Sequence, residues 1–340
     1  MRIVHVNDVA SVATTLVAAQ RALGHDATLR PLHLAAGSRS TPLKLLALPE
    51  RLRELRLVNR DVRRANPDVV HIHYAYLGWA GILGRYPYVL HCHGTDVRAG
   101  LRDPLRAPLV RRSLAAARAV FVSTPDLVPL VAPLRDDVLF VPNPVDTSTF
   151  RPLDGPSPAA TRVLLISAFS DVKRVDIAVD AVRMLRSRRP DVQVTAIDRG
   201  PLASRYRGEP GVTLVSPRPH AAMAELINEH AIVLGQFGIG SLGMAELEAM
   251  ACGRPVVCHY VDGGLYAEPP PLLTAADSAC AARHIEDLLG DPSRARDVGA
   301  HAGDWVRRHH GFLEVGRRLV EEYGPAIRAE APAGARRKRA

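Results

Sequence analysis

Two series of short apolar segments, each alternating with helical segments, constrain the fold of this chain most. The first series comprises residues 2–7, 67–74, 86–94, 119–124 and 137–143, and the second comprises residues 162–168, 192–197, 212–216, 231–236 and 254–259. Most of these segments are Val-rich apolar runs, which is typical of parallel strands buried on both faces. The pattern predicts an α/β protein with two doubly wound parallel sheets. Such sheets bind ligands at the carboxyl ends of their strands.

The segment between the two series is rich in proline and contains a glycine, "FRPLDGPSPAATR" from Phe150 to Arg162. This composition is typical of a connection between domains. We therefore expect an N-terminal domain over residues 1–150, a linker over 151–162 and a C-terminal domain over 163–310. A final helical segment over 311–327 and a basic tail over 328–340 complete the chain.

Length and composition place the chain among soluble globular proteins. Its 340 residues suit two domains, and 47% of them are apolar while 23% are charged. No apolar run reaches the roughly 20 residues of a membrane span, and Met1 leads directly into a strand. The four cysteines form no CxxC pair, which suits a reducing compartment. We expect a cytoplasmic protein.

The net charge of +9, from 44 basic and 35 acidic residues, favours acidic ligands or surfaces. Basic residues gather in the tail, at 336–339, and in residues 43–64, where leucines recur at helical spacing among arginines. The second segment fits either an amphipathic helix with a solvated basic face or a helix that binds an anionic membrane surface. No aromatic platform for stacking bases accompanies it, so we expect no nucleic acid partner.

The stretch "GSLGMAELEAMACGRPVV" from Gly240 to Val257 combines a glycine-rich turn with a short helix. The residues predict a helix over 244–252, with Gly253 just past its end and Pro255 preventing its continuation. Ser241 is a candidate cap, while Gly240 and Gly243 let a ligand approach backbone N–H groups at the positive helix end. The alternative is a capped core helix without a ligand.

Five motifs, in this order and spacing, resemble the retaining GT-B glycosyltransferases of family 4. They are "PDVVHIH" (67–73), "HGTD" (93–96), "VPNPVD" (141–146), "KRVDIAVDAV" (173–182) and "LEAMACGRPVV" (247–257). The resemblance covers nearly the whole chain. It implies two Rossmann-like domains facing across a cleft, a C-terminal helix crossing back to the first domain, and sugar transfer from a nucleotide diphosphate donor to a hydroxyl acceptor with retention.

The resemblance also assigns roles on the donor side. Glu248 aligns with the glutamate that accepts hydrogen bonds from ribose hydroxyls, and Glu246 is a rival on another helix face. Lys173, followed by Arg174, aligns with the lysine that neutralises the pyrophosphate, and His93 aligns with a histidine beside the donor sugar. From the residues themselves we expect the backbone of the turn to cradle an anion and to take over part of the sugar binding; the residues of this turn are Gly240, Ser241, Leu242, Gly243 and Met244.

Four departures separate the chain from the usual family pattern. Gly240 replaces the first glutamate of the paired-glutamate motif, Ala168 replaces an arginine, and Arg174 replaces a glycine. The first loop, "NDVASVATT", contains no glycine where a glycine-rich turn is usual. These departures motivate an alternative function, a catalytically weak nucleotide-sugar-binding protein. A third alternative is a membrane- or polyanion-binding protein that uses the basic segments.

Candidates on the acceptor side keep structural alternatives. Asn7 and Asp8 either contact an acceptor or cap the helix that follows, and Asp96 and Arg98 either position an acceptor or form a salt-bridged loop. Two HxH pairs, formed by His71, His73, His91 and His93, lie on neighbouring expected strands, and a transition metal there is conceivable. Because no carboxylate or cysteine completes that set, we expect no metal, and no cofactor besides the sugar donor.

Overall fold

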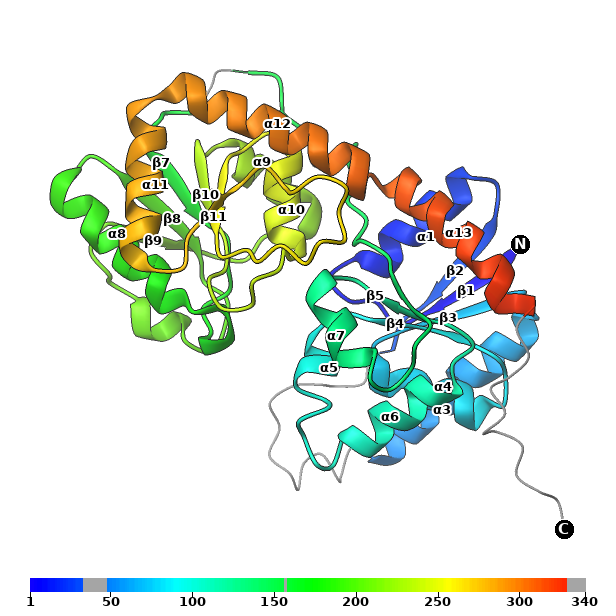
Figure 1. Ribbon diagram of the computed structural model, residues 1–340. Helices are drawn as coiled ribbons and strands as arrows, with labels where there is room; N and C mark the ends of the chain where they lie inside the picture. The colour runs from blue at the N-terminus through cyan, green and yellow to red at the C-terminus, as the bar shows by residue number, and fades with distance from the viewer. Residues whose placement is uncertain (33–47, 156–157, 329–340) are drawn as a thin grey trace, which may run out of the picture. The chain divides into compact units, whose positions relative to one another are not determined.

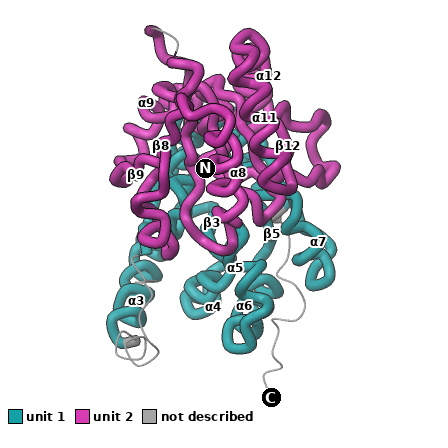
Figure 2. The backbone as a smooth tube through the Cα atoms, turned by 90° about the vertical axis from the view of Figure 1, so that its left-hand side faces the viewer, with its two compact units in different colours: residues 1–144, 312–340 teal, residues 145–311 magenta. Residues whose placement is uncertain are grey.

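The computed structural model describes residues 1–32, 48–155 and 158–328 and consists of two compact units. Unit 1 contains Met1–Pro144 together with Phe312–Ala340, and unit 2 contains Val145–Gly311 (Figure 2). Each unit is built around one six-stranded sheet in which all strand pairs are parallel. The prediction of two doubly wound α/β domains is confirmed.

The sheet of unit 1 has the strand order β2-β1-β3-β4-β5-β6. Its strands are β1 (Arg2–Val6), β2 (Asp26–Arg30), β3 (Val69–His73), β4 (Val89–Cys92), β5 (Val120–Val122) and β6 (Val138–Phe140). The order reverses beside β1, so that β2 and β3 flank it. At such a switch point the connections that follow the neighbouring strands β1 and β3 leave toward opposite faces of the sheet, which opens a crevice at the carboxyl ends of these strands.

Helices cover both faces of this sheet (Figure 1). One face carries α1 (Val12–Ala22) and α13 (Phe312–Arg328), and the other carries α3 (Leu48–Ala65), α4 (Trp79–Gly84) and α6 (Ala107–Ala116). Short turns of helix follow β3, β4 and β5: η1 (Ala75–Gly78), α5 (Thr95–Arg98), η2 (Pro125–Leu127) and α7 (Val128–Val131). A Cβ on Gly316 of α13 would lie 2.7 Å from the Cβ of Ala19 in α1. Glycine therefore lets the C-terminal helix pack closely on unit 1.

The sheet of unit 2 has the order β12-β11-β10-β7-β8-β9. Its strands are β7 (Arg162–Leu165), β8 (Gln193–Ile197), β9 (Val212–Val215), β10 (Ile232–Leu234), β11 (Val256–Cys258) and β12 (Leu273–Thr274). Its helices are η3 (Asp171–Lys173), α8 (Val175–Arg188), η4 (Ala203–Tyr206), η5 (His220–Ala222), α9 (Met223–Asn228), α10 (Met244–Ala251), α11 (Ser278–Gly290) and α12 (Pro292–His310).

Alternate side chains of β7 explain why its sequence is apolar throughout. Val163 and Leu165 belong to a core shared with α8 and α11, whereas Leu164 and Ile166 belong to a second core under α9, α10 and α12. The strand is thus buried on both faces, as its unbroken apolar run predicts.

Domain boundaries differ from the sequence expectation. The expected linker over 151–162 lies inside unit 2, which already begins at Val145. Phe150 is buried in the core of unit 2, and the N–H of Val145 donates to the carbonyl of His310 at 2.7 Å. These contacts draw the segment before the prolines into the second unit. The helix expected over 311–327 is α13, which belongs to unit 1.

Two strands were not predicted. β2 has the sequence "DATLR", with only two apolar residues, because it is the edge strand of its sheet. β12 has two residues and is also an edge strand.

In the parts of the chain that the structure describes, no helix has both the length and the apolar composition needed to cross a membrane. The basic tail at 336–339 and residues 43–47 lie outside the described residues.

Candidate functional site

A glycine-rich loop in unit 2 connects β10 to α10 and is folded around the buried side chain of Gln236. Oε1 of Gln236 accepts the N–H groups of Gly238 at 2.9 Å and Ile239 at 2.6 Å, and its Nε2 donates to the carbonyl of Ser241 at 2.9 Å. Gly240 has φ +75°, a conformation that glycine adopts without strain. The side chain of Gln236 therefore holds this loop in its shape.

Glu246 joins this loop to α10. Its side chain is 3% exposed, and its two carboxylate oxygens accept the N–H groups of Gln236 at 2.9 Å and Gly243 at 3.1 Å. The residue before the helix is Gly243, so the prediction that Ser241 caps α10 is wrong. The carboxylate of Glu246 reaches back to the N–H of Gly243, which is the hydrogen bond that the N3 glutamate supplies in a capping box.

The amino terminus of α10 offers backbone donors. The first helical hydrogen bond of α10 runs from the N–H of Leu247 to the carbonyl of Gly243, at 3.2 Å. The N–H groups of Met244, Ala245 and Glu246 precede this bond and have no acceptor within the helix. They lie at the positive end of the helix dipole, where an anion is stabilised. The side chain of Leu242 instead packs into the core of unit 2.

Lys173 lies beside this helix end. A Cβ built on Gly243 would be 4.0 Å from Nζ of Lys173. The N–H of Phe237 donates to the carbonyl of Lys173 at 2.9 Å, which ties η3 to the glycine-rich loop. The ammonium group and the N–H groups of α10 are therefore neighbours within one unit, as the family resemblance implied.

Arg174 forms an ion pair with its neighbour Asp176. Its guanidinium pairs with the carboxylate of Asp176 at 2.8 Å, and both side chains are about half exposed. Its backbone has φ +49° and ψ +51°, the left-handed region. Glycine adopts that conformation without strain, which explains why a glycine is usual at this position. Arg174 forms the turn that immediately precedes α8.

Glu248 is buried two residues after Glu246. It is 4% exposed, and its Oε1 lies 2.7 Å from Nε2 of His220 in η5. Burial raises the pKa of Glu248, while the hydrogen bond and charge of His220 lower it. The carboxylates of Glu246 and Glu248 are thus both buried in unit 2. Of the two, only Glu248 keeps its carboxylate off the backbone.

In unit 1, the loop after β1 contains three non-glycine residues with positive φ: Asn7 (+71°), Ala10 (+51°) and Ser11 (+64°). They supply the conformations that a glycine-rich turn adopts freely. Asp8 caps α1, since its carboxylate accepts the N–H of Ala13 at 2.9 Å and the hydroxyl of Thr14 at 2.6 Å. Nδ2 of Asn7 donates to the carbonyl of His73 at 3.3 Å. Asp8 thus has the capping contacts that the sequence left as one of two alternatives.

The turn after β4 is organised by Asp96. This carboxylate is 1% exposed and accepts the N–H groups of Ala75, His93 and Gly94 at 2.7 to 3.1 Å. Burial raises its pKa, and these hydrogen bonds oppose the shift. Arg98 pairs not with Asp96 but with Asp126, at 2.6 Å. Asp96 shapes the turn that carries His93, and Arg98 belongs to a neighbouring ion pair.

His93 stands at the carboxyl end of β4 and is half-buried. Its Nε2 lies 2.9 Å from Nδ1 of His73, and burial lowers the pKa of His93 to about 3. The ring is therefore neutral at physiological pH. It is able to orient a hydroxyl by hydrogen bonding, and it carries no positive charge for a phosphate.

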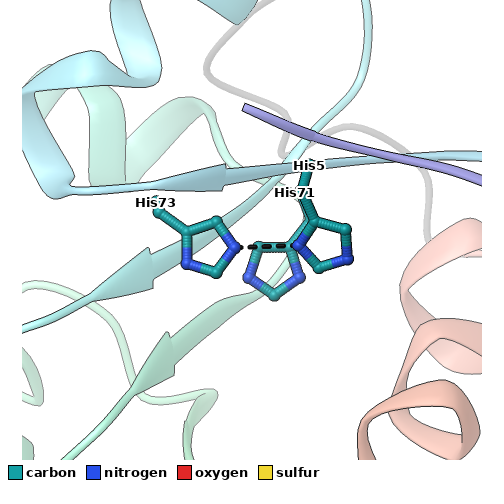
Figure 3. A group of neighbouring side chains, drawn as sticks. All are labelled: His5, His71 and His73. Atoms are coloured by element: carbon teal, nitrogen blue, oxygen red, sulfur yellow. Dashed lines mark hydrogen bonds between the residues drawn. The ribbon is translucent and has the colours of Figure 1, made fainter. Parts of the chain in front are cut away.

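Histidine clustering in unit 1 is larger than the sequence indicated. His5 of β1 lies opposite His71 of β3 and joins the four histidines of the two HxH pairs. Two sets of three, His5 with His71 and His73, and His73 with His91 and His93, have ring nitrogens within 4.8 Å of one another. Figure 3 shows the first set. The sequence shows His5 as the single histidine of the segment "RIVHVN". It does not show that His5 lies opposite His71, because the register between β1 and β3 is known only from the structure.

Functional residues that sequence reasoning missed are mostly partners of predicted ones. Gln236 fixes the glycine-rich loop together with Glu246, which the sequence indicated only as a rival of Glu248, and His220 holds Glu248. His220 lies in "SPRPH", a turn with no motif of its own, so only the fold brings it to α10. The structure brings Lys173, Gly243 and Glu246 together in unit 2, while His93 and Asp96 meet in unit 1.

Two family models match most of the chain. The model described as Glycosyltransferase Family 4 matches residues 9–149, and the model described as Glycosyl transferases group 1 matches residues 160–291. Among curated proteins, a D-inositol 3-phosphate glycosyltransferase from Pseudarthrobacter chlorophenolicus is 26% identical over 312 residues, covering 78% of this chain and 74% of that protein. An N-acetyl-alpha-D-glucosaminyl L-malate synthase from Bacillus anthracis is 26% identical over 292 residues, covering 77% and 74%.

Solved structures share the fold over nearly the whole chain. Sucrose-phosphate synthase from Thermosynechococcus elongatus superposes with a TM-score of 0.72 at 18% identity, covering 97% of this chain and 100% of that one. HepE from Anabaena, solved in complex with UDP-glucose, gives a TM-score of 0.72 at 15% identity, covering 95% and 99%. At these identities the likeness shows a common fold, with two Rossmann-like units in each protein.

Proposed function

We propose that this chain, which belongs to the family 4 glycosyltransferases and has the GT-B fold, transfers a sugar from a nucleoside diphosphate to a hydroxyl acceptor with retention at the anomeric carbon. One observation carries the proposal: Lys173 lies at the amino terminus of α10, whose first N–H groups have no acceptor within the helix. Such a site suits a diphosphate.

The diphosphate is the leaving group in this reaction. The bond from the anomeric carbon to the diphosphate oxygen breaks, and a bond to the acceptor oxygen forms on the same face of the sugar. The acceptor proton leaves with the diphosphate. Negative charge grows on the diphosphate as the bond breaks, so the N–H groups of α10 and the ammonium of Lys173 stabilise the transition state more than the ground state. We therefore propose that transfer needs no divalent metal.

Glu248 would bind the donor ribose. A buried carboxylate that makes no hydrogen bond to the backbone of the described residues is suited to accept hydrogen bonds from hydroxyl groups, and the bond to His220 opposes the rise in the pKa of Glu248 that burial causes. In unit 1, we assign His93 to a hydroxyl of the transferred sugar. Gly240 has no carboxylate for that sugar, so backbone groups of residues 240–244 would take over part of its binding.

Names of related proteins guide the choice of substrates to test. HepE was solved with UDP-glucose, and two curated relatives are named for inositol phosphate and malate, both hydroxyl compounds that carry negative charge. We propose a UDP-sugar as the first donor to test and a small anionic hydroxyl compound as the first acceptor. The net charge of +9 favours such an acceptor.

Two measurements test the proposal. Thermal shifts with UDP, GDP and ADP identify the base, because a ligand that binds only the folded protein raises its melting temperature. Transfer is then assayed with and without EDTA, and NMR reads the anomeric configuration of the product. We expect retention and no loss of activity with EDTA. An inverted product, or a loss that added divalent metal restores, would refute the mechanism.

A second candidate is a nucleotide-sugar-binding protein with little turnover. Gly240 and Ala168 favour it, because each removes a charged side chain that the usual family pattern places near the donor. Nucleotide binding with a normal thermal shift, combined with neither transfer nor donor hydrolysis across the acceptor series, would select this candidate.

A further inference from the structure

Seven polar side chains form one connected network inside unit 1, which we call the histidine ladder. It consists of His5, Gln20, His71, His73, His91, His93 and Tyr323. They come from β1, α1, β3, β4, the residue after β4, and α13. Six of the seven side chains are fully buried, and only His93 reaches the surface in part.

The ladder has two branches that meet at the amide of Gln20. In the first, Oε1 of Gln20 lies 2.8 Å from Nε2 of His5, Nδ1 of His5 lies 2.9 Å from Nε2 of His73, and Nδ1 of His73 lies 2.9 Å from Nε2 of His93. Figure 3 shows the bond between His5 and His73. This branch runs without a gap from the helix α1 to His93.

The second branch runs from the same amide to His91. Nε2 of Gln20 donates to the hydroxyl of Tyr323 at 3.3 Å, this hydroxyl lies 2.6 Å from Nδ1 of His71, and Nε2 of His71 lies 3.2 Å from Nδ1 of His91. Nε2 of His91 is buried and has no partner among the described residues. The second branch therefore ends inside the protein, whereas the first ends at a partly exposed ring.

Burial favours the neutral form of all five rings. Burial lowers the pKa of His5 to about 4 and that of His93 to about 3, and it lowers the pKa values of the other three well below the ordinary value. A neutral imidazole has one N–H donor and one acceptor nitrogen. In a chain of neutral rings, each ring that donates at one nitrogen must accept at the other, so all bonds of a branch point the same way.

The amide of Gln20 sets that direction, because its oxygen only accepts. His5 must donate from Nε2, His73 must then donate from Nε2 to His5, and His93 must donate from Nε2 to His73. We propose that Gln20 is a positioning residue that fixes the proton of His93 on Nε2 and leaves Nδ1 as an acceptor. The proposal deepens the proposed function, on which it rests: His93 would accept a hydrogen bond from a sugar hydroxyl through Nδ1.

The geometry of the rings favours this relay, the chain of hydrogen bonds from Gln20 to His93 through the histidine ladder, over a metal site. The ring planes of His71 and His73 differ by 10° and are stacked, with centroids 4.4 Å apart. His5 is stacked on both of them. A metal ion lies in the plane of each imidazole that binds it, and stacked rings share no such point. The 2.9 Å between His5 and His73 is also shorter than the about 3.3 Å between two nitrogen ligands of a tetrahedral zinc site.

The test reads the tautomer of His93 by long-range proton–nitrogen NMR of the full chain, with the signals assigned by their loss in His93→Asn. We expect the wild type to be protonated at Nε2. Gln20→Glu keeps an acceptor toward His5 and should preserve this tautomer, whereas Gln20→Met, of similar size, should give a mixture. Tyr323→Phe is the matched control, because it removes a hydroxyl from the second branch only and should leave His93 unchanged.

Turnover provides a second readout. We expect Gln20→Met to lower kcat by about tenfold or more with little change in the donor KM, since a histidine held in the wrong tautomer loses its catalytic geometry. Gln20→Glu should restore kcat. A proton on Nδ1 in the wild type, an unchanged tautomer in Gln20→Met, or one equivalent of bound transition metal by elemental analysis would overturn the relay. Tautomer coupling without any sugar transfer would instead refute the proposed function and leave the relay standing.

Discussion

Replacing Glu248 by alanine tests the ribose assignment most directly. His220 already occupies Oε1 at 2.7 Å, so we count one new hydrogen bond from a ribose hydroxyl to Oε2. A hydrogen bond to a charged group contributes about 1.5 to 3 kcal/mol. The nucleotide Kd should therefore rise by about 10- to 150-fold. The free energy of unfolding should change little, because the same substitution also removes a buried carboxylate whose pKa burial raises.

Replacing Glu246 should lower the stability of the protein strongly and affect nucleotide binding only indirectly. Glu246→Ala leaves the N–H groups of Gln236 and Gly243 without their acceptor. Each buried donor without a partner costs about 1 to 3 kcal/mol, so the free energy of unfolding should fall by about 2 to 6 kcal/mol. Affinity for the nucleotide would then fall only because the loop before α10 loses its shape.

Calorimetric titration and urea unfolding of both variants separate the two roles. Glu225→Ala is the matched control, because Glu225 is exposed on α9 of the same unit and should change neither quantity. An unchanged nucleotide Kd in Glu248→Ala would refute the assignment. Equal losses of affinity in the two variants, at equal loss of stability, would show that both residues act only on the fold.

Four further predictions follow from the same structure. Lys173→Ala should lower turnover by about a hundredfold, the scale of losing one transition-state donor, and single-turnover kinetics would measure it. His220→Leu removes a partner that lowers the pKa of Glu248, so that pKa should rise and the acid limb of nucleotide binding should move to higher pH in titrations between pH 5 and 8. Ala10→Gly should stabilise the protein by about 0.5 to 1 kcal/mol in urea unfolding, because relief of a left-handed alanine exceeds the added chain entropy. The arginines of α3 should bind anionic vesicles with about 1 kcal/mol per basic residue near the surface and release them at high salt; equal sedimentation with neutral vesicles would contradict this.

The two sheets could be predicted because their strands are buried on both faces. Residues 163–166 form one unbroken apolar run, because alternate residues pack into the two cores on opposite faces of the sheet. The edge strands could not be predicted in the same way. β2 is only partly buried and carries Asp26 and Arg30 at its ends, so its sequence has no continuous apolar signal. Its partner strand β1, far better buried, supplies the pairing that makes it a strand.

In the proposed donor site, the charged residues could be predicted from the sequence, whereas the residues that hold them in place could not. Lys173 and Glu248 stand in motifs, whereas the residues that hold the site in shape are ordinary ones in sequence. Gln236 follows a strand without any motif, and its role appears only when its side chain turns back onto three groups of the loop. Hydrogen bonds of this kind depend on the backbone path, which local sequence does not specify.

The positions where this chain lacks a glycine that is usual in the family, in the first loop and at Arg174, are therefore weak evidence for an altered binding site. Asn7, Ala10, Ser11 and Arg174 all adopt positive φ, so the backbone keeps a path that glycine adopts freely. A left-handed non-glycine residue costs about 1 to 2 kcal/mol, an amount that well-packed units can offset. Gly240 is different, because a glycine cannot supply the missing carboxylate by conformation. Of all the departures, this one bears on the identity of the donor sugar, and its effect lies in binding rather than in the fold.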